Sequence, residues 1–361
     1  MPDQEQLKSS IMDKDMCSGC GMCVGLCPYI MSIRDSVRVI HSCGLKDGIC
    51  FNTCPKASLN VGELDTSVFG APRKDQALGV FRGIYFARAL NKSSVAQYGG
   101  VASGLMAFAL EQGLVDGAVV TGGSAMEPKP LLAKTAGEVL ACAGSKYTAV
   151  PTLSAFNAAV RDGYARLGLV GRPCQVEAVR KMQAGKHMES HLDREKAAVL
   201  TVGIFCFWSL RPGFYDFLAE KSGGARITRV DIPLEGLTVT AGGNTDTWPV
   251  EEIRQYIKDT CNSCLDSTSE WADISVGSTE YDPQWNTLVI RTVAGQSLVD
   301  LAAQKGVIEM KPYPEERLPI LKRAAINKKM RVLGAEEKPG YLAIPDEYIT
   351  EIKKQWEVLQ P

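Results

Sequence analysis

The sequence has no apolar stretch of the roughly 18 residues that a membrane-spanning helix needs. It also has almost no net charge, since 40 Lys and Arg stand against 41 Asp and Glu, so neither nucleic acid nor a membrane surface is favoured as a partner. The first 16 residues are polar and acidic, unlike a signal peptide. We therefore expect a cytoplasmic protein with no nucleic-acid partner and no transmembrane segment, for which peripheral docking on a membrane complex stays open.

A dinucleotide-binding turn of the Rossmann type is missing as well. No G-x-G-x-x-G follows a predicted strand and opens a helix, so the sequence does not support such a site. No internal repeat is visible beyond two cysteine runs near the N-terminus. With 361 residues, the chain is long enough for two or three domains.

Cysteine is the most informative residue of this chain. In a long sequence without a secretory signal, twelve cysteines indicate metal sites rather than disulfides. Seven of them lie between residues 17 and 54. The other five are Cys142, Cys174, Cys206, Cys261 and Cys264. This distribution predicts an N-terminal metal module followed by a second domain with its own site.

The run CSGCGMCVGLCP, at 17–28, has the C-x2-C-x2-C-x3-C-P spacing of an iron–sulfur module. Three thiolates on one tight loop can bind three corners of a cubane, and Gly19 and Gly21 let the backbone wrap closely around it. The fourth cysteine of such a run usually serves the other cluster of a pair. Because the spacing is specific, a zinc site or a purely structural role is disfavoured.

A second run, HSCGLKDGICFNTCPK at 41–56, is an incomplete copy of the first. Lys46 stands where the pattern expects a cysteine. The two runs of such modules are related by pseudo-twofold symmetry. On this pattern, one cluster is held by a first cysteine group. The other is held by a second cysteine group, which has three thiolates instead of four. The first cysteine group is Cys17, Cys20, Cys23 and Cys54, and the second is Cys27, Cys43 and Cys50.

Three interpretations of the second cysteine group compete. Asp47 or His41 completes a [4Fe–4S] cluster, or the group holds a three-iron cluster, or it is empty and keeps only its fold. We favour an occupied group, because three thiolates are retained and no other purpose for them is evident.

Four of the later cysteines form a third cysteine group. Strand ends and loops at one edge of a sheet can converge, and four thiolates could then hold a further [4Fe–4S] cluster. Zinc or plain buried cysteines are the alternatives, and spacing alone does not decide between them. The third cysteine group is Cys174, Cys206, Cys261 and Cys264. Cys142, between two alanines, is expected to be a small core residue.

The distribution of apolar residues divides the rest of the chain. Residues 56–81 show no sustained period and are expected to be a linker, and an α/β pattern begins at 82. Strands are expected at 83–90, 114–123, 167–173, 196–206, 227–233, 237–242 and 271–278, and helices at 99–113, 151–166, 174–183 and 296–306. The charged tail from about 335 is expected to wrap the surface or contact a partner.

Several motifs in this region occur in an order that resembles a known family. They are YGGVASGLMAFALEQGLVDGAVV, AGSKYT, RPCQVEAVRKMQ, VGIFC, CNSCLD and ADISVGS. The chain resembles the beta subunit of coenzyme F420-reducing hydrogenase and its relatives, including the beta subunit of F420-dependent formate dehydrogenase and the F-subunit of F420H2 dehydrogenase. The resemblance covers about 82–330, and only some members share the N-terminal ferredoxin module.

The resemblance implies an α/β (α+β) domain that binds FAD and one [4Fe–4S] cluster, preceded by a small bacterial-ferredoxin-like domain. The implied divisions are a ferredoxin-like domain at 1–60, a linker at 61–81, the FAD and cluster domain at 82–334 and a tail at 335–361. The cluster falls on the third cysteine group. The implied FAD contacts are Gly99, Gly100, Ser103, Ser145, Lys146, Tyr147, Thr148, Pro173 and Gln175.

The physical chemistry of these contacts agrees with the resemblance. A Gly-Gly pair at a helix start permits close backbone approach, and the exposed N–H groups suit a pyrophosphate. Lys146 would add a point charge for phosphate or for reduced flavin.

The implied function is that of an electron adapter. A flavin accepts a hydride and releases single electrons, and two to three [4Fe–4S] clusters carry them onward. The expected partners are redox subunits of a hydrogenase, formate dehydrogenase, F420H2 dehydrogenase or heterodisulfide reductase-type complex, with coenzyme F420 as substrate. The alternatives are a relative that uses NAD(P)H, ferredoxin or another flavoprotein, and a pure electron-transfer subunit.

Overall fold

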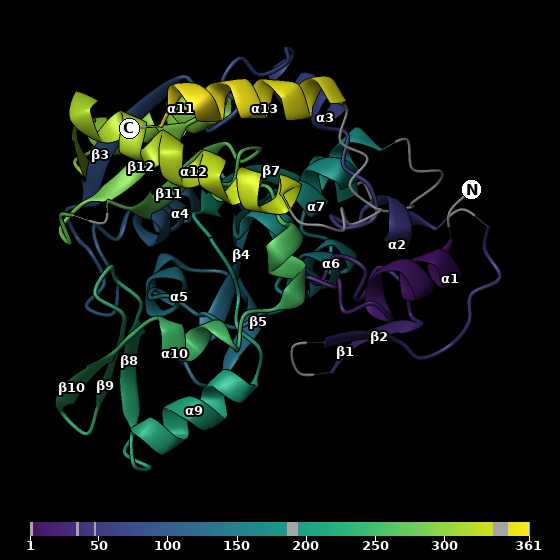
Figure 1. Ribbon diagram of the computed structural model, residues 1–361, viewed down its shortest axis with the longest axis horizontal. Helices are drawn as coiled ribbons and strands as arrows, with labels where there is room; N and C mark the ends of the chain where they lie inside the picture. Colours follow the sequence, from purple (N-terminus) through teal and green to yellow (C-terminus); the bar gives the residue numbers. More distant parts are fainter. Residues whose placement is uncertain are drawn as a thin grey trace.

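The computed structural model describes residues 3–33, 36–46, 48–185, 194–279, 281–334 and 346–360. An eight-stranded mixed sheet lies at its centre, in the order β13-β3-β12-β11-β7-β6-β4-β5 (Figure 1). Helices cover this sheet, and the N-terminal residues pack at one side of it, on the right in Figure 1. The expected mixed α/β class is confirmed.

Four neighbouring strands of the large sheet run parallel. They are β4 (Gly117–Gly123), β6 (Leu167–Gly171), β7 (Ala198–Ile204) and β11 (Ile274–Ser278). Parallel strands end at the same edge of a sheet, so the segments that follow them meet there. All four strands match expected ones.

The other strands of the large sheet pair antiparallel. They are β3 (Gly83–Ala89), β5 (Pro128–Ala133), β12 (Asn286–Ile290) and β13 (Ile308–Pro312). Only β3 was expected from the sequence. β5 and β13 contain proline, which argues against a central strand, and both lie at the edges of the sheet.

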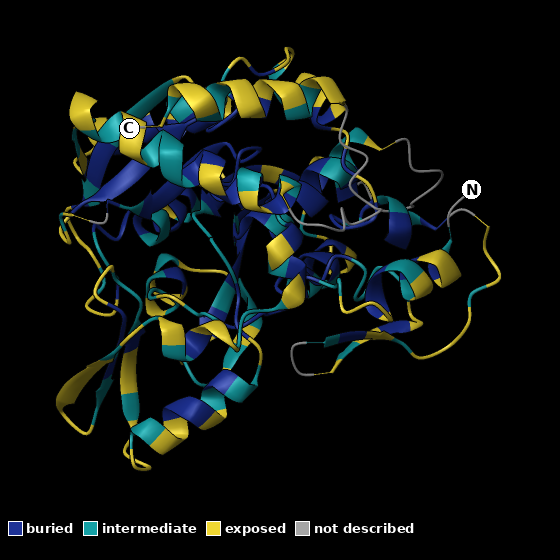
Figure 2. Ribbon diagram, viewed as in Figure 1, coloured by how far each residue is buried: buried dark blue, intermediate teal, exposed yellow. Residues whose placement is uncertain are grey.

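Alternation along the strands separates two hydrophobic cores. On β4, Ala118 and Val120 belong to one core and Val119 to the other, because successive side chains of a strand point to opposite faces. Figure 2 shows the central strands of the large sheet and the inner sides of the helices that cover it as mostly buried. The first core includes α4 (Val101–Glu111), α5 (Ala136–Ala141) and α11 (Val293–Gln304), and the second includes α6 (Leu153–Arg161) and α7 (Pro173–Ala184). A short helix, α8 (Arg194–Ala197), precedes β7.

A smaller sheet projects below the large one in Figure 1. Its three strands, in the order β10-β9-β8, surround a separate core with α9 and α10. Their bounds are β8 (Ile227–Asp231), β9 (Leu237–Ala241), β10 (Asn244–Trp248), α9 (Gly213–Lys221) and α10 (Glu251–Arg254). The sequence predicted β8 and β9 but not β10.

The N-terminal residues form a small unit around the first two cysteine groups. Leu7, Ile11, Ile30 and Val37 build its core together with Cys50. The elements are α1 (Gln4–Leu7), a π-helical turn η1 (Lys8–Met12), the hairpin β1 (Ile30–Ile33) and β2 (Ser36–Val39), and α2 (Ile49–Asn52).

The segment at 61–81 differs from the irregular linker that we expected. It carries helix α3 (Val61–Phe69), whose Val61 and Leu64 are buried against Val176 of α7 and Trp271. The side chain of Asn60 caps this helix by accepting from the Glu63 N–H (3.1 Å). Asn60 followed three residues later by Glu63 is a sequence pattern that predicts the start of a helix.

Two helices follow β13 after the 3-10 turn η3 (Glu315–Arg317). They are α12 (Leu318–Leu333) and α13 (Asp346–Val358), which lie against each other along the top of Figure 1. The expectation that the tail wraps the surface holds for α13, since Ile352 is buried against Ala77 and Ile326. Residues 335–345 of that tail lie outside the described residues.

Candidate functional site

A cavity of about 390 Å³ lies at the edge where the parallel strands end. Thr121 of β4, Gly171 of β6, Ile204 of β7 and Ser278 of β11 all line it. The carboxyl ends of parallel strands are where ligands bind in open α/β sheets, and the volume is that of a cofactor or substrate site. The cavity therefore follows from the sheet topology.

Most of the expected FAD contacts line this cavity. They are Gly100, Ser103, Ser145, Lys146, Tyr147, Thr148 and Gln175. Gly99 lies directly before them, and Pro173 is the first residue of α7, which starts beside the cavity. The structure thus brings together residues that are distant in sequence, and their contact with FAD stays a prediction.

The Gly-Gly pair has a clear steric basis. A Cβ on Gly99 would lie 2.7 Å from the carbonyl oxygen of Ala87 and 2.9 Å from Oδ1 of Asn286, so no side chain fits. Gly100 is left-handed (φ 68°) at the start of α4. The Val101 N–H donates to Oδ1 of Asn286 (3.1 Å), a capping residue on β12 that sequence reasoning missed.

The ammonium group of Lys146 is already hydrogen-bonded to backbone carbonyl oxygens. Its Nζ donates to the carbonyl oxygens of Cys142 (2.5 Å), Ala143 (3.0 Å) and Gly144 (3.0 Å) at the end of α5. Burial lowers the pKa of its ammonium group. Lys146 therefore stabilises the loop in which it lies, beside the cavity. Its contact with phosphate or flavin stays a prediction.

Tyr147 and Thr148 join the cavity wall to the small sheet and α9. The Tyr147 hydroxyl donates to Oδ1 of Asp231 (3.0 Å) and accepts from the N–H of Ile232 (3.1 Å). Burial, with the charge of Asp231, raises the pKa of this hydroxyl far above its usual value, so it stays protonated. The Thr148 hydroxyl bonds to the Tyr215 hydroxyl of α9.

The third cysteine group converges beside the cavity. Cys174 lies in the first turn of α7, Cys206 follows β7 and lines the cavity, and the last two cysteines flank the end of the 3-10 turn η2 (Asp259–Ser263). Burial raises the pKa of Cys206 to about 12, and the neighbouring Cys261 and Cys174 thiols add to this. The structure therefore brings the four predicted residues together.

Arg172 lies among these thiols, and sequence reasoning did not assign it. Burial alone would lower its pKa, but the surrounding thiol groups, Cys174 first, raise it overall. Its Nη1 donates to the Ser209 hydroxyl (2.6 Å), while its buried Nη2 has no hydrogen-bond partner among the described residues. A buried guanidinium nitrogen without a partner, on a residue that lines the cavity and lies among the thiols, fits an anionic group bound next to it.

The four cysteines of the first group also lie near one another, and their role as cluster ligands stays a prediction. Burial raises the pKa of Cys23, and the other members of the group, Cys20, Cys17 and Cys54, raise it further. Two backbone N–H groups donate to sulfur, from Gly19 to Cys17 (3.4 Å) and from Lys56 to Cys54 (3.4 Å). Backbone N–H donors to sulfur are typical of iron–sulfur sites.

The first and third cysteine groups are neighbours. The pKa of Cys20 is raised chiefly by burial and next by Cys174 of the third group. Conversely, Cys20 is among the thiols that act on Arg172. Cys20 and Cys174 also belong to the same packed core, so the first group lies next to the third, which adjoins the cavity.

The structure places the three thiols of the second cysteine group near one another, and their role as cluster ligands stays a prediction. Burial raises the pKa of Cys50 to about 11, with further contributions from Cys27 and Cys43. Of the proposed fourth ligands, His41 is exposed with its ring edge-on to Tyr29 (5.0 Å), and Asp47 lies outside the described residues. Lys46 is exposed.

Cys142 packs at the margin of the first core, under Gly122. Its place agrees with the expected small core residue, although it also reaches the cavity wall. In the described part of the chain, no three His, Cys, Asp or Glu side chains are close enough to hold a single metal ion. The cysteine groups are therefore more widely spaced than a mononuclear site.

Three lysines donate hydrogen bonds to backbone carbonyl oxygens of the cysteine groups or of adjacent residues, and so place positive charge near these groups. Lys181 donates to the carbonyl oxygen of Cys54 (2.5 Å) and Lys328 to that of Cys206 (2.8 Å). Lys56 donates to the carbonyl oxygen of Thr260 (3.1 Å), next to Cys261. These cations favour negatively charged clusters at the same positions.

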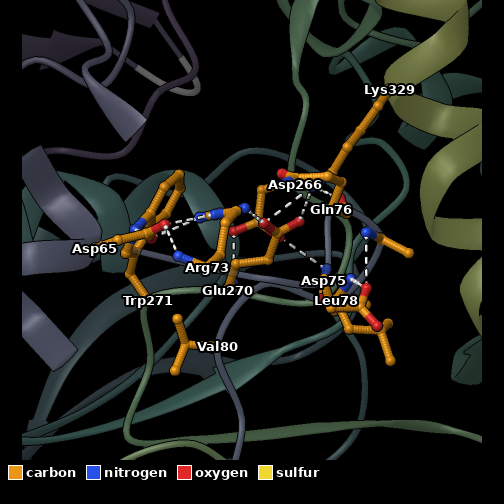
Figure 3. Close-up of polar contacts among 12 residues, drawn as sticks. Asp65, Arg73, Asp75, Gln76, Leu78, Val80, Asp266, Glu270, Trp271 and Lys329 are labelled. Atoms are coloured by element: carbon orange, nitrogen blue, oxygen red, sulfur yellow. Dashed lines mark hydrogen bonds and ion pairs between the residues drawn. The ribbon is translucent and has the colours of Figure 1, made fainter. Parts of the chain in front are cut away.

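A buried ionic network supports the loop after Cys264 (Figure 3). Arg73 pairs with Asp65 (2.6 Å) and with Glu270, and Lys329 pairs with Glu270 (2.7 Å). Because Asp65 comes from α3 and Lys329 from α12, the network joins chain segments distant in sequence. Asp266 adds two bonds to this loop, accepting from the N–H groups of Thr268 and Glu270 (2.8 Å each).

Two family models match the chain, and both describe the beta subunits of coenzyme F420 hydrogenase/dehydrogenase. The model of the N-terminal part of these subunits covers residues 84–157, and the model of their C-terminal part covers residues 164–316. No helix of the described part of the chain has the length and apolar character to cross a membrane.

Individual relatives agree with these models. The beta subunit of coenzyme F420 hydrogenase from Methanothermobacter thermautotrophicus is 34% identical over 70% of this chain and 92% of its own. The F-subunit of F(420)H(2) dehydrogenase from Methanosarcina mazei is 27% identical over 85% of this chain and 88% of its own. Coenzyme F420-dependent sulfite reductase of Methanocaldococcus jannaschii is 29% identical over 87% of this chain, and the match spans 50% of that relative's length.

A solved structure is similar as well. A chain of the F420-reducing [NiFe] hydrogenase complex from Methanosarcina barkeri superposes with a TM-score of 0.66 and 31% identity. The similarity covers 71% of this chain and 91% of that one.

Proposed function

The chain belongs to the family of coenzyme F420 hydrogenase/dehydrogenase beta subunits, and on that premise we propose that it exchanges a hydride between coenzyme F420 and an FAD in the cavity. Single electrons then pass through the iron–sulfur clusters of the three cysteine groups. The observation that carries this proposal is Cys206, which belongs to the third cysteine group and also lines the cavity. A flavin in that cavity would be next to a cluster.

The cavity residues fit the parts of FAD. Gly100 to Ser103, the residues at the start of α4, line the cavity, and a helix N-terminus suits a pyrophosphate. The unpartnered Nη2 of Arg172 offers a cation beside the third cysteine group. Apolar residues such as Val120, Val170 and Ile204 supply a wall for a ring system.

When bound, FAD would supply the exchange between hydride transfer and single-electron transfer. The chain's own residues position it. Gly99 leaves room for the turn, Lys146 holds the 142–146 loop together at the end of α5, and Tyr147 stays protonated as a hydrogen-bond donor. Arg172 keeps positive charge between the cavity and the cluster, which stabilises added electrons on either side.

The order of the cysteine groups gives the electron path. The third group adjoins the cavity, the first adjoins the third through Cys20 and Cys174, and the second adjoins the first in the N-terminal unit. Cys50 belongs to the second group and acts on Cys23 of the first. We propose that 1–60 is a ferredoxin-like module that delivers electrons to a partner redox subunit in the cytoplasm.

F420-dependent electron transfer is the direct test. Anaerobically purified protein should oxidise reduced F420 with a one-electron dye as acceptor, followed by the return of F420 absorbance. The control is the same protein stripped of its flavin, which should be inactive until FAD is restored. Activity with NADPH alone would favour the alternative donor. Intact clusters with no bound flavin would favour a pure electron-transfer subunit.

A further inference from the structure

Gln4 is a buried polar residue that lies over the second cysteine group. Its side chain is only 3% exposed, although it stands at the start of the chain's first helix. Its Nε2 donates to Sγ of Cys27 (3.9 Å), and its Oε1 accepts from the backbone N–H of Cys43 (2.8 Å). One amide therefore bridges two of the three thiol-bearing residues.

The orientation of this amide follows from its partners. The Cys43 N–H can only donate, so the carbonyl end of Gln4 must face it, and the NH2 end then faces the sulfur of Cys27. The reverse orientation would place an oxygen against a thiolate and an NH2 group against an N–H. The contact to Cys27 is thus a donated N–H···S bond.

The helix that carries Gln4 is held firmly. Asp3 caps α1 by accepting from the Gln6 N–H (3.0 Å), and Leu7 and Ile11 are buried in the core of the N-terminal unit. A Cβ on Gly48 would lie 3.2 Å from the backbone of Asp3, so Gly48 packs closely against the residue that precedes Gln4. These contacts hold the backbone of Gln4 beside the second cysteine group.

Backbone N–H groups reach sulfur in both N-terminal groups, from Gly19 to Cys17 and from Lys56 to Cys54 in the first, and from Phe51 to Cys50 in the second. In the second group a side chain makes the contact to Cys27. Donors to cluster sulfurs stabilise the reduced, more negative state and raise the reduction potential.

We propose that Gln4 is a positioning residue that raises the reduction potential of the cluster held by Cys27, Cys43 and Cys50. This inference rests on the proposed clusters but not on F420 as substrate. In an incomplete group, Gln4 compensates in part for the missing cysteine by tying Cys27 to the Cys43 loop.

The test is an EPR-monitored redox titration of the full chain, with the second-site signal assigned by its loss in Cys43→Ser. Gln4→Leu removes the donor at similar volume, and Gln4→Glu keeps the acceptor for Cys43 but replaces the donor with a negative charge. We expect the midpoint of the second-site signal to fall in Gln4→Leu and further in Gln4→Glu. The signals of the other two sites should not move.

Matched controls are Gln6→Leu and Gln6→Glu, because Gln6 is exposed on the same helix. Unchanged midpoints in both Gln4 variants, or equal shifts in the Gln6 variants, would overturn the proposal. Loss of the second-site signal in both Gln4 variants would show a role in holding the cluster and overturn the tuning role. If Cys43→Ser removes no signal, the second group is empty and this inference fails, while F420 activity can still be present.

Discussion

Removing the charge of Glu270 should destabilise the protein strongly. Buried charged groups of both signs lie around the loop after Cys264. They include Asp65, Asp266, Glu270, Arg73, Arg291 and Lys329. Glu270→Gln leaves one positive charge without compensation at nearly the same side-chain volume.

The magnitude follows from the geometry of the network. Glu270 bonds to Arg73 and lies 2.7 Å from Lys329, and all three side chains are at most 3% exposed. Removing one partner of a buried ion pair costs about 3–5 kcal/mol, since the remaining charge cannot be hydrated. We expect the free energy of unfolding of Glu270→Gln to fall by this amount.

The pH dependence has a definite sign. Burial would raise the pKa of Glu270, but Lys329 and Arg73 outweigh burial and the pKa is lowered overall. The ionised carboxylate therefore contributes stability above its unfolded pKa of about 4.3, and this contribution is lost as the pH falls through the lower folded pKa. The variant should lose this acid-dependent component.

Chemical denaturation at neutral and at acid pH is the assay. Asp116→Asn is the matched control, because its bridge to Arg166 is exposed and should contribute less than about 1 kcal/mol. Equal losses in Glu270→Gln and Asp116→Asn would refute the reasoning. So would a Glu270→Gln protein as stable as wild type.

Three further predictions concern the cofactors. Anaerobically purified protein should contain about twelve iron per chain, roughly four for each cluster, and release FAD on acid extraction; about four iron would contradict the ferredoxin-like module, and zinc in place of iron would contradict all three sites. Lys46→Cys should complete the second cysteine group and lower its potential in an EPR titration, and no change would contradict a tuned, incomplete cluster. Gly99→Ala should lose FAD in a flavin-content assay, because its Cβ would collide with Ala87 and Asn286, whereas Gly137→Ala, at an exposed position of α5, should retain it.

Local spacing predicted which cysteines lie near one another, because each run is short and tightly turned. Cys17, Cys20, Cys23 and Cys54 were grouped from the pseudo-twofold pattern, and the structure places them close together. The third group was predicted from where its cysteines stand, at a strand end and a helix start. Parallel strand topology then places these ends at one edge.

The contacts that the sequence did not reveal are those between distant segments. Asn286 caps α4 from 185 residues away, and Lys328 reaches the carbonyl oxygen of Cys206 from 122 residues away. No local pattern marks such residues, because polar side chains of this kind are usually exposed. Helix α3 is different. Asn60 and Glu63 form a capping pattern that predicts a helix start, but the segment shows no longer apolar period, and we therefore expected a linker there.

The charge around the third cysteine group gives an independent reason to expect an anionic cofactor there. Arg172 is buried with one nitrogen bonded to Ser209 and the other unpartnered among the described residues, and its neighbour Cys174 has a thiol whose pKa burial raises. Lys328 is buried too, and it donates to carbonyl oxygens. Burying cations is costly unless negative charge compensates them. Neutral thiols would not provide that charge, but thiolates bound to iron and a flavin pyrophosphate would, so the fold should be more stable with its cofactors than without them.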